Sequence, residues 1–209
     1  MTTREKLLLE SKAWVKENLL LDKGLFERLA DMHNPDVLWI GSSDSLVPVR
    51  EVTNTDPGEI LVYRNIANQV RQDDMSFMAL LQDSLEVAKI DLIIICGYSH
   101  CGGIRDVLLG TEDRPLVQRW LSGLKDLYAA HKEELDNLPF DPKERRLSEI
   151  NIKQQIINLS KIDIVQRSWQ TRSAPILLGW YFDMNSGELT EVFRMDPNEK
   201  LHRVSNLLE

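Results

Sequence analysis

The sequence contains only two cysteines, Cys96 and Cys101, in 209 residues. Two cysteines this close together cannot form a disulfide framework, which excludes the small disulfide-stabilised secreted domains. We expect Cys96, within an apolar run, to be a core residue. Cys101 stands outside that run, so it remains a candidate for chemistry.

The sequence also lacks a long hydrophobic run, an internal repeat and a basic stripe. No apolar stretch approaches membrane-spanning length, and MTTREKLLLE contains no apolar signal-peptide region, so we expect a cytoplasmic protein with no membrane partner. The net charge is −8, which argues against a nucleic-acid partner because nothing offsets the repulsion from phosphates. With 43% hydrophobic and 28% charged residues, the chain is typical of a globular protein.

Strand patterns and helix patterns alternate along the chain. Such alternation predicts an α/β fold with a mostly parallel central sheet, one antiparallel edge strand and flanking helices. The last two strands should form a hairpin across Asn185-Ser186-Gly187. The expected strands are 37–40, 60–64, 91–96, 176–182 and 189–193. A Thr2–Glu5 capping box predicts the start of an N-terminal helix, and a further helix should begin at Cys101. Apolar spacing predicts a helix with Met78, Leu81, Leu85 and Ala88 on one face. The other expected helical stretches are 27–32, 115–135 and 143–170.

Four segments of the sequence resemble the β-class carbonic anhydrases in order and spacing. They are LWIGSSDSLVP, DPGEILVYRNIANQV, IIICGYSHCGG and LLGWYFDMNSGEL. The resemblance covers nearly the whole chain and is most similar to the bicarbonate-regulated bacterial subgroup. It implies a single domain over 1–209, with a helical arm at 1–34 and an α/β core at 35–209. It also implies a homodimer or a dimer of dimers, with active sites at the dimer interface.

The resemblance also implies where a zinc site would lie, and there the sequence departs from the family. Family members hold zinc through a Cys-x-Asp-x-Arg turn and a His-x-x-Cys turn. Here Ser42 and Leu46 stand at the cysteine and arginine positions of the first turn, around Asp44. Tyr98 stands at the histidine position of the second turn, before Cys101.

A serine hydroxyl and a phenol are poor zinc ligands at neutral pH. We therefore expect no metal and no cofactor, and very low or absent CO2 hydration. His100 adjoins Cys101, and neighbouring residues seldom direct their side chains at one ion. A three-ligand site of Asp44, Cys101 and His33 is an alternative that we rank well below the absence of zinc.

The candidate catalytic residues are those expected in the old pocket. Cys101 begins a helix, where the dipole favours a thiolate nucleophile, although a small packing residue is the alternative. Asp44 is a candidate acid or base, or a cap on backbone N–H groups. Tyr98 and Ser42 could bind a substrate or satisfy each other, and His33 could enter the pocket. Leu46 would make the pocket more apolar.

A second candidate site is for an anion. Trp39, Arg64 and Tyr181 match the residues that bind noncatalytic bicarbonate in the regulated subgroup. The alternative is that Arg64 neutralises nearby acids while the two aromatic side chains fill the core.

Three functions follow from this sequence, and we favour the first. It is an enzyme repurposed in the old pocket, acting without metal on a small carboxylate or carbonyl compound. The second is an inactive homologue that binds bicarbonate or another anion, or regulates a paralogue. The third is a residual carbonic anhydrase with rewired zinc ligands.

Overall fold

A computed structural model describes residues 1–31, 35–111 and 113–197 of the chain. The chain divides into two compact units, Met1–Asn34 and Pro35–Glu209. The first unit contains helices α1 (Thr3–Leu21) and α2 (Leu25–Asp31). The capping box at the start of α1 is confirmed, because the Thr2 side chain and the Glu5 carboxylate each accept the other's backbone N–H.

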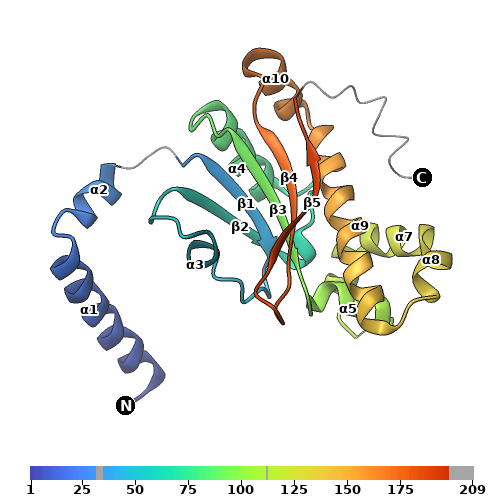
Figure 1. The fold of residues 1–209 in the computed structure, drawn as a ribbon, viewed down its shortest axis with the longest axis horizontal. Coiled ribbons are helices and arrows are strands. Elements are labelled where there is room, and N and C mark those ends of the chain that lie inside the picture. The colour runs from blue at the N-terminus through green and yellow to red at the C-terminus, as the bar shows by residue number, and fades with distance from the viewer. Residues whose placement is uncertain (32–34, 112, 198–209) are drawn as a thin grey trace. The chain divides into compact units, whose positions relative to one another are not determined.

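The second unit is built on a five-stranded sheet in the order β2-β1-β3-β4-β5 (Figure 1). The first three pairings are parallel, and β4 and β5 are antiparallel, which confirms the expected sheet and its hairpin edge. The strands are β1 (Val37–Ser42), β2 (Ile60–Asn65), β3 (Leu92–Tyr98), β4 (Ile176–Phe182) and β5 (Leu189–Met195).

The two long helical stretches expected from the sequence are divided. The 115–135 stretch becomes three helices because the backbone leaves helical geometry at Leu121 (ψ 8°) and at His131 (ψ 16°). The 143–170 stretch becomes two because Ile162 is extended. The helices of this unit are α3 (Val49–Thr53), η1 (Ile66–Asn68), α4 (Met75–Glu86), α5 (Gly102–Leu109), α6 (Pro115–Trp120), α7 (Ser122–Ala130), α8 (Lys132–Asp136), α9 (Phe140–Ser160) and α10 (Asp163–Arg172).

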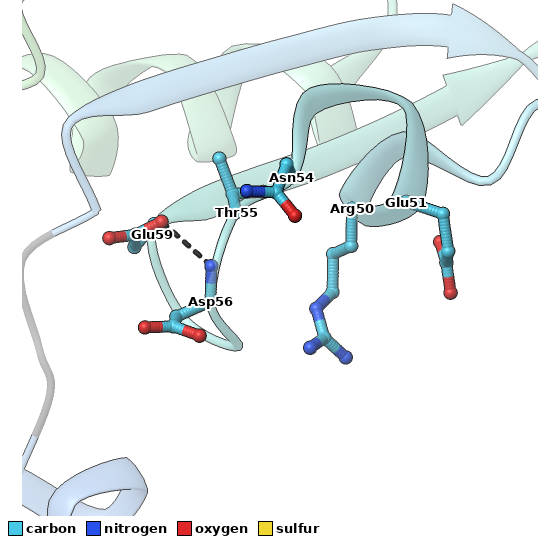
Figure 2. A pocket seen from close by; sticks show the side chains of 6 residues that line it. All are labelled: Arg50, Glu51, Asn54, Thr55, Asp56 and Glu59. Carbon is cyan, nitrogen blue, oxygen red and sulfur yellow. Dashed lines mark hydrogen bonds between the residues drawn. The ribbon is translucent and has the colours of Figure 1, made fainter.

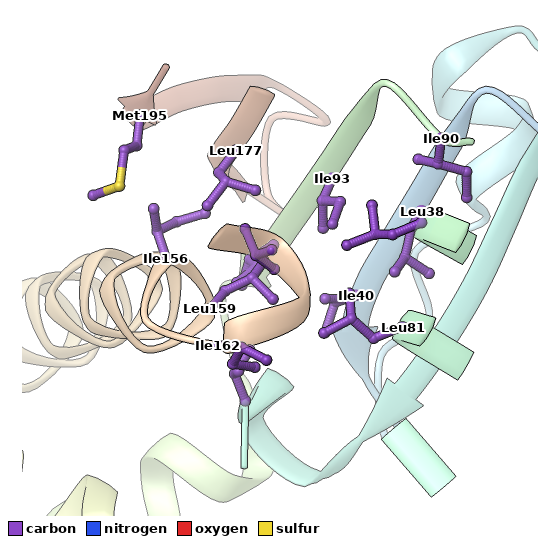
Figure 3. Packing of buried hydrophobic residues seen from close by; sticks show 14 of the residues in the cluster. Leu38, Ile40, Leu81, Ile90, Ile93, Ile156, Leu159, Ile162, Leu177 and Met195 are labelled. Carbon is purple, nitrogen blue, oxygen red and sulfur yellow. The ribbon is translucent and has the colours of Figure 1, made fainter. Parts of the chain in front are cut away.

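Apolar residues cover both faces of the sheet, as expected for central parallel strands. On one face Leu38, Ile93 and Leu177 pack with residues of α4 and α9, including Leu81 and Ile156 (Figure 3). The residues that alternate with them, such as Trp39, Ile94 and Leu178, pack in a second cluster on the other face. Packing on both faces holds the strands in place, including the strand ends that carry the candidate site. Among the described residues, no helix is both long and apolar enough to cross a bilayer.

Candidate active site at the carboxyl ends of β1 and β3

Four of the residues singled out in the sequence meet where β1 and β3 end. Ser42 is the last residue of β1 and Tyr98 the last of β3, and Cys101 is the N-cap of α5. Because the two strands are parallel neighbours, their carboxyl ends lie at the same edge, the usual ligand position in α/β sheets. Asp44, in the turn after β1, completes the group.

The Asp44 carboxylate is held by donors on both oxygens. Ser42 Oγ donates to Oδ1 at 2.5 Å, and the backbone N–H of Gly102 donates to Oδ2 at 2.7 Å. Ser42 is fully buried and accepts the backbone N–H of Ala67 at 3.0 Å, whereas Asp44 is exposed. The carboxylate is therefore fixed in direction and still accessible from outside.

The backbone around this carboxylate leaves no room for larger residues. A Cβ added to Gly102 would lie 2.6 Å from Asp44 Oδ2, which explains why glycine follows Cys101. On the other side, Ala67 adopts a left-handed conformation with φ 60°, which is uncommon for a residue with a Cβ. This conformation directs its N–H to Ser42.

The expectation that Cys101 forms a thiolate readily is wrong. Cys101 is 1% exposed, and burial, with the nearby charge of Asp44, raises the pKa of its thiol to about 11. The backbone N–H groups at the start of α5 lower this pKa, but by less than burial raises it. The thiol lies 3.7 Å from Ser42 Oγ and 4.0 Å from Asp44 Oδ1, so it is a weak neutral donor beside both.

Tyr98 is also a neutral donor. It is buried, and burial raises the pKa of its phenol well above the ordinary value, with Cys101 and Asp44 adding to the effect. The hydroxyl therefore keeps its proton at neutral pH. The site combines one exposed carboxylate with three uncharged side chains that carry O–H or S–H groups.

The predicted anion site is divided by the sheet. Arg64 donates to the backbone carbonyls of Ser42 (3.1 Å), Ser45 (3.2 Å) and Val47 (2.8 Å), so its guanidinium braces the turn after β1. Trp39 lies on the same face, buried with its ring edge against Trp180.

Tyr181 lies on the opposite face. It alternates with Leu178, Trp180 and Phe182, which pack on the Trp39 side, and the Arg145 guanidinium of α9 lies 5.0 Å above its ring. The structure therefore does not bring Tyr181 together with Trp39 and Arg64.

The other sequence candidates do not add a described side chain to this group. His33 is outside the described residues. Leu46 is 80% exposed, so the expectation that it makes the pocket apolar is not met in this chain. The expectation for Cys96 is confirmed: it is buried in the core, and burial raises the pKa of its thiol. His100 accepts from Arg105 at Nδ1 and faces Asn185.

A separate surface cavity of about 480 Å³ lies beside α3 (Figure 2). Its lining is polar and comes from α3 and from the turn before β2, where the backbone N–H of Asp56 donates to Glu59. None of the four site residues lines it. The lining residues are Arg50, Glu51, Asn54, Thr55, Asp56 and Glu59.

The sequence did not identify two backbone donors of the site. Asp44 was a candidate cap for N–H groups in its own turn, whereas the donor in the structure is Gly102 at the start of α5. The Ala67 N–H, which donates to Ser42, was not expected, because a backbone donor leaves no side-chain signal. The sequence offers two weak indications, the glycine after Cys101 and the polar RNIANQV segment, and both are too general to identify a donor.

Sequence comparison with known proteins identifies the family. The model described as "Carbonic anhydrase" matches residues 37–189. The chain is 35% identical over 191 residues to a carbonic anhydrase of Emericella nidulans, covering 91% of this chain and 83% of the relative. A carbonic anhydrase of Synechococcus elongatus is 30% identical, with 85% of this chain and 67% of the relative covered.

Solved structures agree with the sequence comparison. A tetrameric β-carbonic anhydrase of Sordaria macrospora superposes with a TM-score of 0.86 at 29% identity, over 90% of this chain and 96% of that one. A β-carbonic anhydrase of Aspergillus fumigatus gives 0.87 at 28% identity, over 99% and 97%.

These relatives correct the expectation that no cofactor is involved. β-Carbonic anhydrases are zinc enzymes, so zinc is the cofactor that the match implies. The side chains at the site do not fit it well: Ser42 Oγ is already engaged by Asp44 and Ala67, and the Tyr98 phenol is protonated. Within residues 1–31, 35–111 and 113–197, no group of three His, Cys, Asp or Glu could hold a metal ion.

The family model spans all of β1 to β4 and the site between them, and the structural match extends over the whole core. The chain therefore belongs to the β-class carbonic anhydrase family.

Proposed function

We propose that this β-carbonic anhydrase homologue uses the site at the ends of β1 and β3 for acid–base chemistry on a small neutral carbonyl compound. Asp44 acts as the general base and Tyr98 as the donor to the carbonyl oxygen. The observation that supports this is the exposed Asp44 carboxylate, oriented by Ser42 and Gly102 beside two protonated donors.

The proposed step is proton removal next to the carbonyl. Asp44 takes a proton from the carbon adjacent to the C=O group, and the C–H electron pair moves to form the enolate. The charge that develops on oxygen is stabilised by the Tyr98 hydroxyl, whose raised pKa keeps it protonated. Nothing is oxidised or reduced, and return of the proton closes the cycle.

The geometry disfavours two alternatives for this site, a Cys101 nucleophile and an anionic substrate. A Cys101 nucleophile would have to ionise from a pKa of about 11 while buried. An anionic substrate would be repelled by the Asp44 carboxylate, and the guanidinium of Arg64, which braces the turn carrying Asp44, is already bonded to three carbonyls. A neutral carbonyl compound avoids both difficulties.

The test is exchange of α-protons for deuterium in D2O, followed by NMR, with acetone and dihydroxyacetone as first substrates. Wild-type protein should accelerate exchange, and Asp44→Asn should lower the rate by at least about 100-fold, as expected for loss of a general base. Asn still accepts from Gly102, so the fold should be kept. Asp126→Asn, an exposed change in α7, is the matched control. Equal rates for wild type and Asp44→Asn, or no acceleration at all, would contradict the proposal.

A second candidate is the reaction after which the family is named. It is favoured by the 35% identity to the carbonic anhydrase of Emericella nidulans. Stopped-flow hydration of CO2 by the same protein preparation distinguishes the two candidates. CO2 hydration by the wild type without α-proton exchange would support this second candidate and contradict our proposal. Hydration that persists in Asp44→Asn would also show that Asp44 is not needed for it.

We also propose that the chain works as a homodimer or a dimer of dimers. The support is the tetrameric state of the Sordaria macrospora relative and the apolar surface of α1, on which Leu7, Leu8 and Leu20 are exposed. Light scattering should give a mass of two or four times 24.1 kDa. A monomer at micromolar concentration would contradict this proposal.

A further inference from the structure

A second cavity lies beside the turn between β3 and α5, and Ser99 and His100 of that turn line it. Its volume is about 290 Å³, enough for a small metabolite. The β3–α5 turn, the start of α9 and the β4–β5 hairpin contribute its walls. The lining residues are Ser99, His100, Asp141, Pro142, Glu144, Arg145, Tyr181, Asp183 and Asn185.

Glu144 is the unusual residue of this lining. It is 3% exposed, and its Oε2 accepts from Arg105 Nε at 3.0 Å, while its Oε1 is buried with no hydrogen-bond partner in the described part of the chain. His100 does not supply the missing donor, because its Nδ1 accepts from Arg105 and lies 3.9 Å from the other oxygen, Oε2. A buried carboxylate oxygen without a donor is costly and rare.

The rest of the lining favours a positively charged ligand. Asp141, Glu144 and Asp183 contribute three carboxyl groups, and hydrogen bonds from Asn185 and Ser186 hold the pKa of Asp183 below its usual range. Arg145 is the guanidinium of the lining. It is engaged by Glu149 at 3.0 Å, lies 4.0 Å from Asp183 and lies over the Tyr181 ring, so the lining keeps two more carboxyl groups than guanidinium groups. The ring of Tyr181 and Pro142 offer apolar surface to a short carbon chain.

We propose that this cavity binds a small molecule with a primary ammonium group, which donates to Glu144 Oε1. An ammonium supplies three N–H donors and a charge, and a charge-assisted hydrogen bond is the strongest that a carboxylate oxygen can form. The Tyr181 hydroxyl in this lining can hydrogen-bond a polar group at the far end of the ligand, whereas the Asn185 side chain already contacts His100. The site is independent of the proposed function of the Asp44 pocket, with which it shares only the connecting turn.

The test is titration of the full-length protein with ethanolamine, followed by backbone-amide NMR shifts. Shifts should appear at Ser99 and Asn185. Glycine, which adds a carboxylate, should bind more weakly, and ethylene glycol, which has the hydroxyl groups but no ammonium, should not bind measurably. Comparable binding of ethylene glycol and ethanolamine would overturn the proposal.

Variants locate the ammonium at Glu144. Glu144→Gln keeps the shape and should weaken ethanolamine binding about 10-fold to 100-fold through loss of the charge. Glu133→Gln, an exposed change in α8, is the matched control and should bind as wild type does. If Glu144→Gln does not fold, Tyr181→Phe keeps the packing and should still weaken binding several-fold. Unchanged binding in whichever of these two variants folds would contradict the assignment.

Discussion

Asp44 and Glu144 both lie beside the connection between β3 and α5, and their surroundings differ: Asp44 accepts the Gly102 N–H, and Glu144 lies 3.9 Å from His100. Asp44 is exposed, yet both of its oxygens are hydrogen-bonded. Glu144 is buried, yet one of its oxygens has no partner among the described residues. An oriented carboxylate open to the outside suits proton transfer, whereas a buried one lacking a donor suits binding of a cation. The predictions below test this contrast.

The largest expected effect is on the affinity for zinc at the Asp44 pocket. Ser42→Cys combined with Tyr98→His supplies a thiolate and an imidazole beside Cys101 and should raise zinc affinity on the order of a thousandfold or more. Each single variant should give a smaller gain. Metal analysis after dialysis against a graded series of chelators measures the difference. No gain in the double variant would show that the four side chains do not converge as described.

The next largest effect is a loss of α-proton exchange activity when a substitution at Gly102 displaces the Asp44 carboxylate. Gly102→Ala places a Cβ 2.6 Å from Asp44 Oδ2 and should displace the carboxylate. α-Proton exchange should fall at least about 10-fold, because proton transfer depends on orientation. Gly123→Ala, where an added Cβ meets nothing within 4 Å, is the control. Ethanolamine binding should be unaffected in both, and its loss in Gly102→Ala would mean that the two sites are one.

The two carboxylates should also differ in their contribution to stability. Arg105→Met leaves the buried Glu144 without its ion pair and should lower the free energy of unfolding by about 1–3 kcal/mol. Asp44→Asn, at an exposed position that keeps the Gly102 bond, should cost less than about 1 kcal/mol. Urea denaturation of the two variants compares them directly. A larger loss of unfolding free energy in Asp44→Asn than in Arg105→Met would contradict the difference proposed between the two carboxylates.

The smallest effect is on the reactivity of Cys101. Because its thiol pKa is about 11, iodoacetamide labelling of the native protein should be slow at neutral pH and should rise as the pH approaches 11, where the thiolate forms. Asp44→Asn removes a charge that raises this pKa and should speed labelling a few-fold at a given pH. Glu144→Gln should not. Rapid labelling of the wild type at neutral pH would contradict this prediction and support the hypothesis that Cys101 is a thiolate nucleophile.

Much of the fold could be predicted from the sequence because it depends on local patterns. The continuous apolar run of β3 and the turn at Asn185-Ser186-Gly187 each determine one element of the sheet. The helix breaks at Leu121 and His131 were not predicted, because neither residue is a proline or a glycine and Gly123 lies inside the following helix.

The site was predicted less completely than the fold. The motif positions of Ser42, Asp44, Tyr98 and Cys101 were sufficient to group them. The pKa of Cys101 depends on the balance between burial and the helix start, which only the three-dimensional structure provides. The face of β4 on which Tyr181 lies depends on strand register. Glu144 was missed because its importance comes from an absent hydrogen bond.

The most direct test of the account is a crossed measurement on Asp44→Asn and Glu144→Gln, each assayed for α-proton exchange and for ethanolamine binding. The account predicts that Asp44→Asn loses exchange and keeps binding, and that Glu144→Gln loses binding and keeps exchange. If either variant lost both properties while remaining folded, or if neither variant lost its assigned one, the division of roles between the two carboxylates would be contradicted.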